Sequence, residues 1–75
     1  MDQIERKRII ERVYAALLER GYRPVDQIIG YILTDDPTYI ANHKGARRMI
    51  AGIDRHDLLC DLLSDYFAAK SVGIA

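Results

Sequence analysis

Apolar residues recur every three to four positions over residues 4–20, which predicts an amphipathic helix. The charged residues of this segment fall on the opposite side of the helix. The apolar stripe consists of Ile9, Ile10, Val13, Tyr14, Leu17 and Leu18. Gly21 ends the helix, because glycine readily takes the left-handed conformation that closes a helix carboxyl end. Pro24 begins the next helix, because its fixed φ suits a first helical turn.

The second predicted helix, residues 25–33, is apolar on nearly every side, so we expect it to be central in the fold. Gly30 lies inside it, and glycine in a helix interior costs about 1 kcal/mol relative to alanine. We therefore expect another helix or a partner copy to approach the chain closely at Gly30. The alternative is that this glycine is a neutral substitution.

The remaining pattern predicts three more helical elements. Asp36 is a natural N-cap, and Pro37 after it starts a short turn that includes Tyr39 and Ile40. Residues 42–52 have helical spacing and form a fourth helix. Asp54 caps a fifth, which ends near Lys70 and Gly73 and carries a continuous apolar stripe: Leu58, Leu59, Leu62, Leu63, Tyr66 and Phe67. The prediction is an all-α, compact bundle of about five short helices.

Seventy-five residues make one domain, residues 1–75, which removes only about 60–65% of its unfolded surface from water. The single cysteine, Cys60, excludes an intramolecular disulfide as a remedy for the small core. Association of two copies is the remaining remedy, so we expect a homodimer. The residues expected in its core or dimer contacts are Gly30, Tyr31, Leu33, Leu59, Leu62, Leu63 and Tyr66.

Charge and hydropathy narrow the class of protein. Eleven basic and eleven acidic side chains cancel, whereas a nucleic-acid binder usually carries a basic excess. The chain has no run of 18 apolar residues, and its charged start, MDQIERKR, is unlike a signal peptide. We expect a cytoplasmic protein that binds neither nucleic acid nor membrane. A helix-turn-helix DNA binder is the alternative, although the helix after Gly21 carries Asp26 and apolar residues where base-reading side chains would be needed.

Candidate catalytic and metal-binding groups are few. His56 and Cys60 are four residues apart with Asp57 between them, a spacing that places two metal ligands on one helix face. A closed site needs about four ligands, and His43 is the only other histidine. The pair also lacks an orienting third group for nucleophilic catalysis. We therefore expect no metal, no cofactor and no enzymatic activity, with Cys60 at or near the apolar stripe.

Basic residues gather at two places. Arg6, Lys7, Arg8 and Arg12 alternate with glutamates, which indicates a solvated helix face with pairs along the helix. The second group follows the acidic turn of Asp35 and Asp36 and consists of His43, Lys44, Arg47 and Arg48. We interpret the second group and the acidic turn as the site that binds a protein partner with acidic or phosphorylated side chains. The alternative is that Arg47 pairs internally with a carboxylate such as Asp36.

Fourteen residues of the middle of the chain follow a specific pattern: Gly-Tyr-x-Pro, x-Gln-Ile-x-Gly-Tyr-x-Leu, Asp-Pro-x-Tyr-Ile and Ala-Arg. They are Gly21, Tyr22, Pro24, Gln27, Ile28, Gly30, Tyr31, Leu33, Asp36, Pro37, Tyr39, Ile40, Ala46 and Arg47. This pattern resembles the IreB family over residues 13–67. The resemblance implies a small, all-α, homodimeric, cytoplasmic regulatory protein of Gram-positive bacteria. It implies a pathway in which a Ser/Thr kinase controls cell-wall synthesis and antibiotic tolerance, and a partner that is such a kinase or a protease-linked wall enzyme.

One departure from the family matters for regulation, and it concerns the segment before the first helix. The resemblance implies phosphorylated threonines in a segment before the first helix, whereas the first threonine here is Thr34. We therefore expect no phosphorylation, because Thr34 and Thr38 lie at structured turns. Smaller departures from the family, which affect the expected partner surface more than the fold, are Ala41, Asn42, Gly45 and His56.

Overall fold

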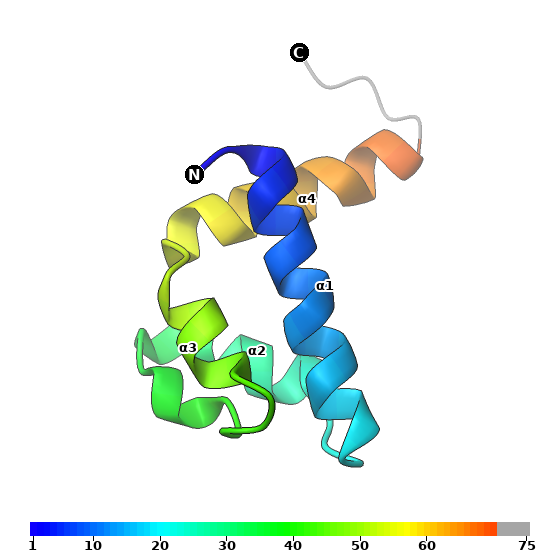
Figure 1. Ribbon diagram of the computed structural model, residues 1–75. Helices are drawn as coiled ribbons and strands as arrows, with labels where there is room; N and C mark the ends of the chain where they lie inside the picture. The colour runs from blue at the N-terminus through cyan, green and yellow to red at the C-terminus, as the bar shows by residue number, and fades with distance from the viewer. Residues whose placement is uncertain (71–75) are drawn as a thin grey trace.

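The structure, a computed structural model, describes residues 1–70 and contains four α-helices and one short 3-10 turn around a common core (Figure 1). The elements are α1 (Gln3–Glu19), α2 (Pro24–Thr34), η1 (Pro37–Tyr39), α3 (Ala46–Ala51) and α4 (Arg55–Ala69). No strand occurs among these 70 residues. The predicted all-α class is confirmed.

The predicted helix ends agree with the structure at three places. Gly21, just after α1, has φ +79°, and Pro24 is the first residue of α2. Asp54 accepts a hydrogen bond from the Asp57 backbone N–H at 3.1 Å and so caps α4. Lys70 follows α4 as its C-cap, whereas Gly73, the other predicted end, lies outside the described residues.

The short turn predicted after Asp36 is present, whereas the helix predicted after it is shorter than expected. The turn at Pro37 is a 3-10 turn of three residues, with Asp36 as its N-cap. The helix predicted for residues 42–52 begins only at Ala46. Lys44 and Gly45 have φ values of +50° and +76°, and a right-handed helix cannot include such residues. Residues 1–70 therefore form four α-helices and one 3-10 turn.

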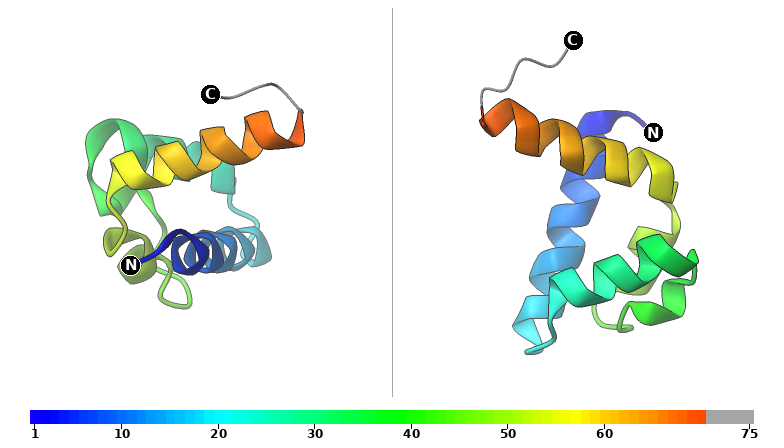
Figure 2. Two further views of the ribbon diagram at one scale, coloured as in Figure 1. Left: turned by 90° about the horizontal axis from the view of Figure 1, so that it is seen from above. Right: turned by 180° about the vertical axis from the view of Figure 1, so that it is seen from behind.

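The core forms where α1 packs against α2, α3 and α4. Figure 2 shows α4 crossing the amino-terminal half of α1, while α2 lies beside the other half. Tyr31 is buried, and its hydroxyl donates a hydrogen bond of 2.9 Å to the Ile53 carbonyl. The buried apolar residues are Val13, Ala16, Leu17, Ile28, Tyr31, Ile40, Ala46, Ile50, Ile53 and Leu58.

Gly30 is needed because the Tyr39 ring lies against it. A Cβ atom at Gly30 would overlap this ring, with Tyr39 Cγ only 2.9 Å away. The close approach that the sequence predicted is present, but its source is the η1 turn of the same chain. Neither another α-helix nor a partner copy is required to explain this glycine.

Replacing Gly30 with alanine is therefore expected to lower the free energy of unfolding by about 1–3 kcal/mol, because overpacking outweighs the gain of about 1 kcal/mol in helix propensity. Gly52→Ala is the matched control, since its Cβ would meet the Met49 carbonyl oxygen at an ordinary 3.6 Å. Urea unfolding at one fixed protein concentration measures both variants. A more stable Gly30→Ala protein would show that the Tyr39 contact is unimportant.

Candidate functional site

The four basic residues predicted to bind a partner lie on the loop before α3 and on α3 itself. This loop is fixed at both ends, because Ile40 and Ala46 are fully buried. The Ala41 backbone N–H also donates to Gln27 Oε1 at 2.9 Å, which ties the loop to α2. We call His43, Lys44, Arg47 and Arg48 the basic patch. The backbone that carries the basic patch is therefore anchored to the core.

Two members of the basic patch contact the last residue of α1. Lys44 Nζ lies 2.8 Å from Glu19 Oε2, and His43 Nε2 lies 3.6 Å from Glu19 Oε1. The hydrogen bond from Lys44 is the largest cause of a lowered pKa at Glu19, with smaller contributions from the charge of Lys44 and from His43. The charge of Lys44 is thus already partly balanced inside the chain.

The two arginines of the basic patch have different roles. Arg47 is half-buried, and its Nε–H donates to the Ile40 carbonyl at 2.9 Å. Arg48 is exposed and has no ion pair among residues 1–70. Arg47 therefore holds the loop in place, while Arg48 presents its charge to solvent. The alternative interpretation, in which Arg47 pairs with a carboxylate such as Asp36, is corrected: its partner is the backbone carbonyl of Ile40.

The acidic turn consists of Asp35 and Asp36, both exposed. Asp35 ends α2 in the left-handed conformation, with φ +57°. Asp36 Oδ1 accepts hydrogen bonds from the Thr38 hydroxyl at 2.7 Å and the Thr38 backbone N–H at 3.0 Å. These bonds lower the pKa of Asp36, and the charge of Arg47 contributes less. The Asp36 carboxylate is thus hydrogen-bonded within the turn. It also interacts electrostatically with Arg47 of the basic patch.

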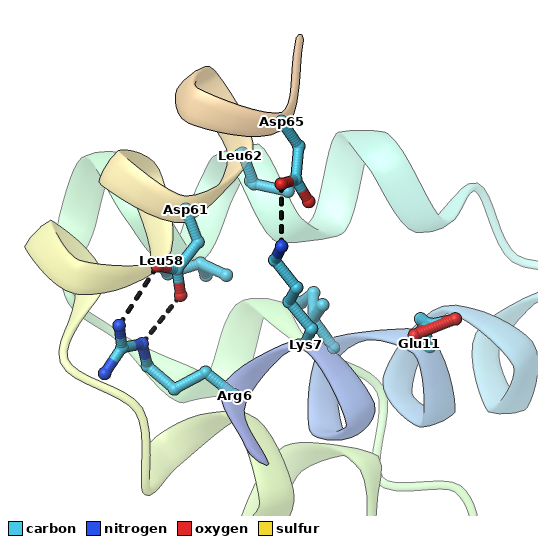
Figure 3. A pocket seen from close by; sticks show the side chains of 8 residues that line it. Arg6, Lys7, Glu11, Leu58, Asp61, Leu62 and Asp65 are labelled. Atoms are coloured by element: carbon cyan, nitrogen blue, oxygen red, sulfur yellow. Dashed lines mark hydrogen bonds and ion pairs between the residues drawn. The ribbon is translucent and has the colours of Figure 1, made fainter. Parts of the chain in front are cut away.

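Two ion pairs that sequence reasoning missed join α1 to α4. Arg6 Nε and Nη2 donate to Asp61 Oδ2 and Oδ1 at 2.6 and 3.0 Å, and Lys7 Nζ lies 2.7 Å from Asp65 (Figure 3). Asp61 is buried. For Arg6 and Lys7, the predicted pairing along one solvated helix face was wrong, because their partners are on α4. The sequence held one signal of the Arg6–Asp61 pair: an acidic residue, Asp61, directly precedes Leu62 of the apolar stripe, where a charge needs a partner.

The Arg6–Asp61 pair is expected to make folding sensitive to acid. The hydrogen bonds from Arg6 lower the pKa of Asp61 in the folded protein below its unfolded value, near 3.9. The stabilisation is therefore present above that value and is lost as the pH falls through the folded pKa. Asp61→Asn should lower the urea midpoint at pH 7, and the difference from the unmodified protein should shrink toward about pH 3.

Asp65→Asn is the matched control, because Asp65 also pairs across α1 and α4 but is half-exposed. Its effect on the midpoint should be smaller at every pH, since exposed pairs contribute little. Equal midpoints for the Asp61→Asn and unmodified proteins at pH 7 would contradict a stabilising role for the pair.

An apolar groove of about 390 Å³ lies between α1, α2 and α4. Its lining is Ile10, Glu11, Tyr14, Val25, Ile28, Ile29, Ile32, Leu59 and Leu62. Among the residues expected in core or dimer contacts, only Leu59 and Leu62 line the groove. Leu33, Leu63 and Tyr66 are exposed outside it, whereas Tyr31 belongs to the core and Gly30 packs on Tyr39.

The His56 and Cys60 side chains lie close together at the start of α4. Cys60 Sγ is 3.8 Å from His56 Nδ1, and ligand atoms of Asp54, His56 and Asp57 lie within 4.8 Å of one another. All four residues are exposed. Cys60, expected at or near the apolar stripe, is exposed, and its thiol lies against the His56 ring. Asp54 is already used as the cap of α4.

Within residues 1–70, no helix has both the length and the apolar character needed to cross a membrane.

Fold and site together define a small all-helical protein that presents an anchored basic patch and an apolar groove. The chain matches the family model described as IreB regulatory phosphoprotein over residues 1–68. It is also 50% identical over 60 residues to a UPF0297 protein of Lachnoclostridium phytofermentans, across 80% of this chain and 68% of that protein. The chain belongs to the IreB family, which confirms the resemblance noted in the sequence and points to a regulatory role.

Proposed function

We propose that this protein is a non-enzymatic regulator that acts by binding another protein through the basic patch. The observation that carries this proposal is the exposed Arg48, which has no ion pair within residues 1–70, beside a loop whose backbone is anchored to the core. Arginine suits bidentate contacts with carboxylates and phosphates, so the partner segment is acidic or phosphorylated. The test is whether reversal of the Arg48 charge weakens partner binding by about ten- to a hundredfold while the fold remains intact.

The acidic turn gives the surface its selectivity. Asp35 and Asp36 precede η1, which packs against α3, the helix that carries Arg48. A partner with acidic groups opposite the basic patch and a basic or neutral group opposite the acidic turn would fit both. A uniformly acidic partner would be repelled at the turn.

The proposal includes an isologous homodimer formed through the apolar groove. Large apolar side chains that line it, including Val25, Ile29 and Leu62, are between 40% and 57% exposed in the single chain. A domain of 75 residues gains little from its own core, so burial of this surface against a second copy adds substantially to its stability. The exposed Leu63, Tyr66 and Phe67 extend the same apolar helix, α4, beyond the groove.

The proposed setting follows from the family. We place the protein in the cytoplasm of a Gram-positive bacterium, in a Ser/Thr-kinase-linked pathway that controls cell-wall synthesis and antibiotic tolerance. The partner is then a kinase or a protease-linked wall enzyme. Thr34 and Thr38 are poor phosphate acceptors, because their hydroxyls donate to the Gly30 carbonyl and to Asp36 at 2.7 Å each.

The helix-turn-helix alternative has little support in the arrangement of α2. This helix follows the Gly21 turn, and it exposes Val25, Ile29 and Leu33 where a recognition helix needs side chains that read bases.

A further inference from the structure

The carboxylate of Glu19 lies between the His43 ring and the Lys44 ammonium group of the basic patch. One oxygen faces Lys44 Nζ at 2.8 Å, and the other faces His43 Nε2 at 3.6 Å. Glu19 comes from α1, whereas His43 and Lys44 come from the loop before α3. The two loop residues therefore act together on a single anionic group, supplied here by the chain itself.

The negative charge of Glu19 is unfavourable at its position in α1. Glu19 is the last residue of α1, where the helix dipole presents its negative end, and the last turn of α1 contains no basic residue. Among residues 1–70, the contacts of the Glu19 carboxylate are to the loop residues His43 and Lys44. The contact is also open to solvent, because the Glu19 and Lys44 side chains are 51% and 60% exposed. Exposed pairs of this kind are weak and readily exchanged.

The His43 ring is not satisfied by Glu19. Its Nε2 atom is buried and has no hydrogen-bond partner among residues 1–70, because 3.6 Å to Glu19 is too long for a good hydrogen bond. An anionic oxygen closer to Nε2 would make this bond. The site thus has an unsatisfied ring nitrogen, which donates when it carries a proton, in addition to the exchangeable Lys44 contact.

A shallow hollow of about 340 Å³ leads to this position. It lies between α1 and the segment that carries Lys44, and its lining is Arg12, Ala15, Ala16, Glu19, Lys44 and Met49. Arg12 adds a second exposed cation on its rim. Glu19 is the only acid in this lining. Without the Glu19 charge, the hollow would be a cationic pocket open to an incoming side chain.

We propose that the position between His43 and Lys44 binds one anionic group of the protein partner, a carboxylate or a phosphate, and that Glu19 is an internal competitor for it. This inference rests on the proposed function of the basic patch. In the free protein Glu19 fills the position, and a partner group must displace it. Glu19 thereby sets the affinity of the basic patch and restricts binding to partners that can outcompete it.

The test is a pair of NMR titrations, with inorganic phosphate and with acetate at constant ionic strength, that follow the backbone amides of residues 42–48. Glu19→Gln should bind phosphate or acetate about three- to fivefold more tightly than the unmodified protein, because the competing charge is gone. Glu5→Gln is the matched control. It removes the same charge at the far end of α1 and should leave the affinities for both anions unchanged. Adding Lys44→Met to Glu19→Gln should abolish the gain.

The two anions distinguish the sources of the partner group. If Glu19→Gln binds phosphate more tightly than acetate, the partner group is a phosphorylated side chain. If it binds acetate as tightly as phosphate or more tightly, the partner group is a carboxylate. The inference is overturned if Glu19→Gln binds neither anion more tightly than the unmodified protein. It is also overturned if Glu5→Gln gives the same gain, since the effect would then be one of net charge.

Failure of this inference is separable from failure of the proposed function. If Glu19→Gln leaves both affinities unchanged while Arg48→Glu abolishes partner binding, the internal competitor is excluded and the basic patch still binds the partner. If Glu19→Gln gives the expected gain while Arg48→Glu leaves partner binding intact, the anion position is supported and the role proposed for Arg48 fails.

Discussion

Replacing Leu62 with glutamate is expected to convert the proposed homodimer into monomers. Leu62 lines the apolar groove and is 40% exposed in the single chain, so a second copy seated there would cover the new carboxylate. A buried charge without a partner is costly, and we expect the dissociation constant of the dimer to rise by at least about a hundredfold. Light scattering at micromolar concentration should give about twice 8.6 kDa for the unmodified protein and about 8.6 kDa for the variant.

Leu18→Glu is the control for this experiment. Leu18 is 54% exposed on α1, but it does not line the groove, so the same substitution there should leave the dimer intact. Circular dichroism should show equal helix content for both variants. A monomeric unmodified protein would rule out the homodimer, and equal dissociation by both variants would remove the groove as its interface.

Replacing Arg48 with glutamate should weaken partner binding by about ten- to a hundredfold. The change removes one charge-assisted contact, worth about 1.5–3 kcal/mol, and adds repulsion toward an acidic partner. Because Arg48 is exposed and unpaired among residues 1–70, the free energy of unfolding should change by less than about 0.5 kcal/mol. Surface plasmon resonance against the captured partner and urea unfolding measure the two effects.

Two further variants test whether the effect on binding belongs to Arg48 itself. Arg47→Glu should weaken binding and also lower stability, because Arg47 loses its hydrogen bond to the Ile40 carbonyl. Arg8→Glu reverses the same charge on an exposed position of α1, and it should preserve binding. Full binding by a folded Arg48→Glu protein would mean that the partner contacts another surface, with the acidic turn of Asp35 and Asp36 as the next candidate.

The sequence predicted the helices well because their signals are local. The period of apolar residues, the Gly21 and Pro24 boundary and the Asp54 cap all act within a few residues, and the structure confirms them. The start of α3 was placed too early because nothing in the apolar spacing shows that Lys44 takes a positive φ. Backbone conformation at a loop depends on contacts that a single segment does not contain.

Long-range packing was harder to predict. The second helix is apolar on nearly all sides, so its periodicity could not separate Tyr31, which is 3% exposed, from Leu33, which is 75% exposed. The Arg6–Asp61 pair spans 55 positions, and its arginine lies in a segment that looks solvated by local pattern. The basic patch was found from its sequence, but Glu19, which balances part of its charge, lies 25 positions from Lys44.

The most direct test of the account is partner capture from a Gram-positive lysate with the unmodified protein, Arg48→Glu and Arg8→Glu, each shown to be folded. Captured proteins are quantified by mass spectrometry. A regulator that acts through the basic patch should enrich at least one protein with the unmodified and Arg8→Glu baits and lose about tenfold or more of it with Arg48→Glu. Capture of the same proteins in equal amounts by all three baits would contradict the account.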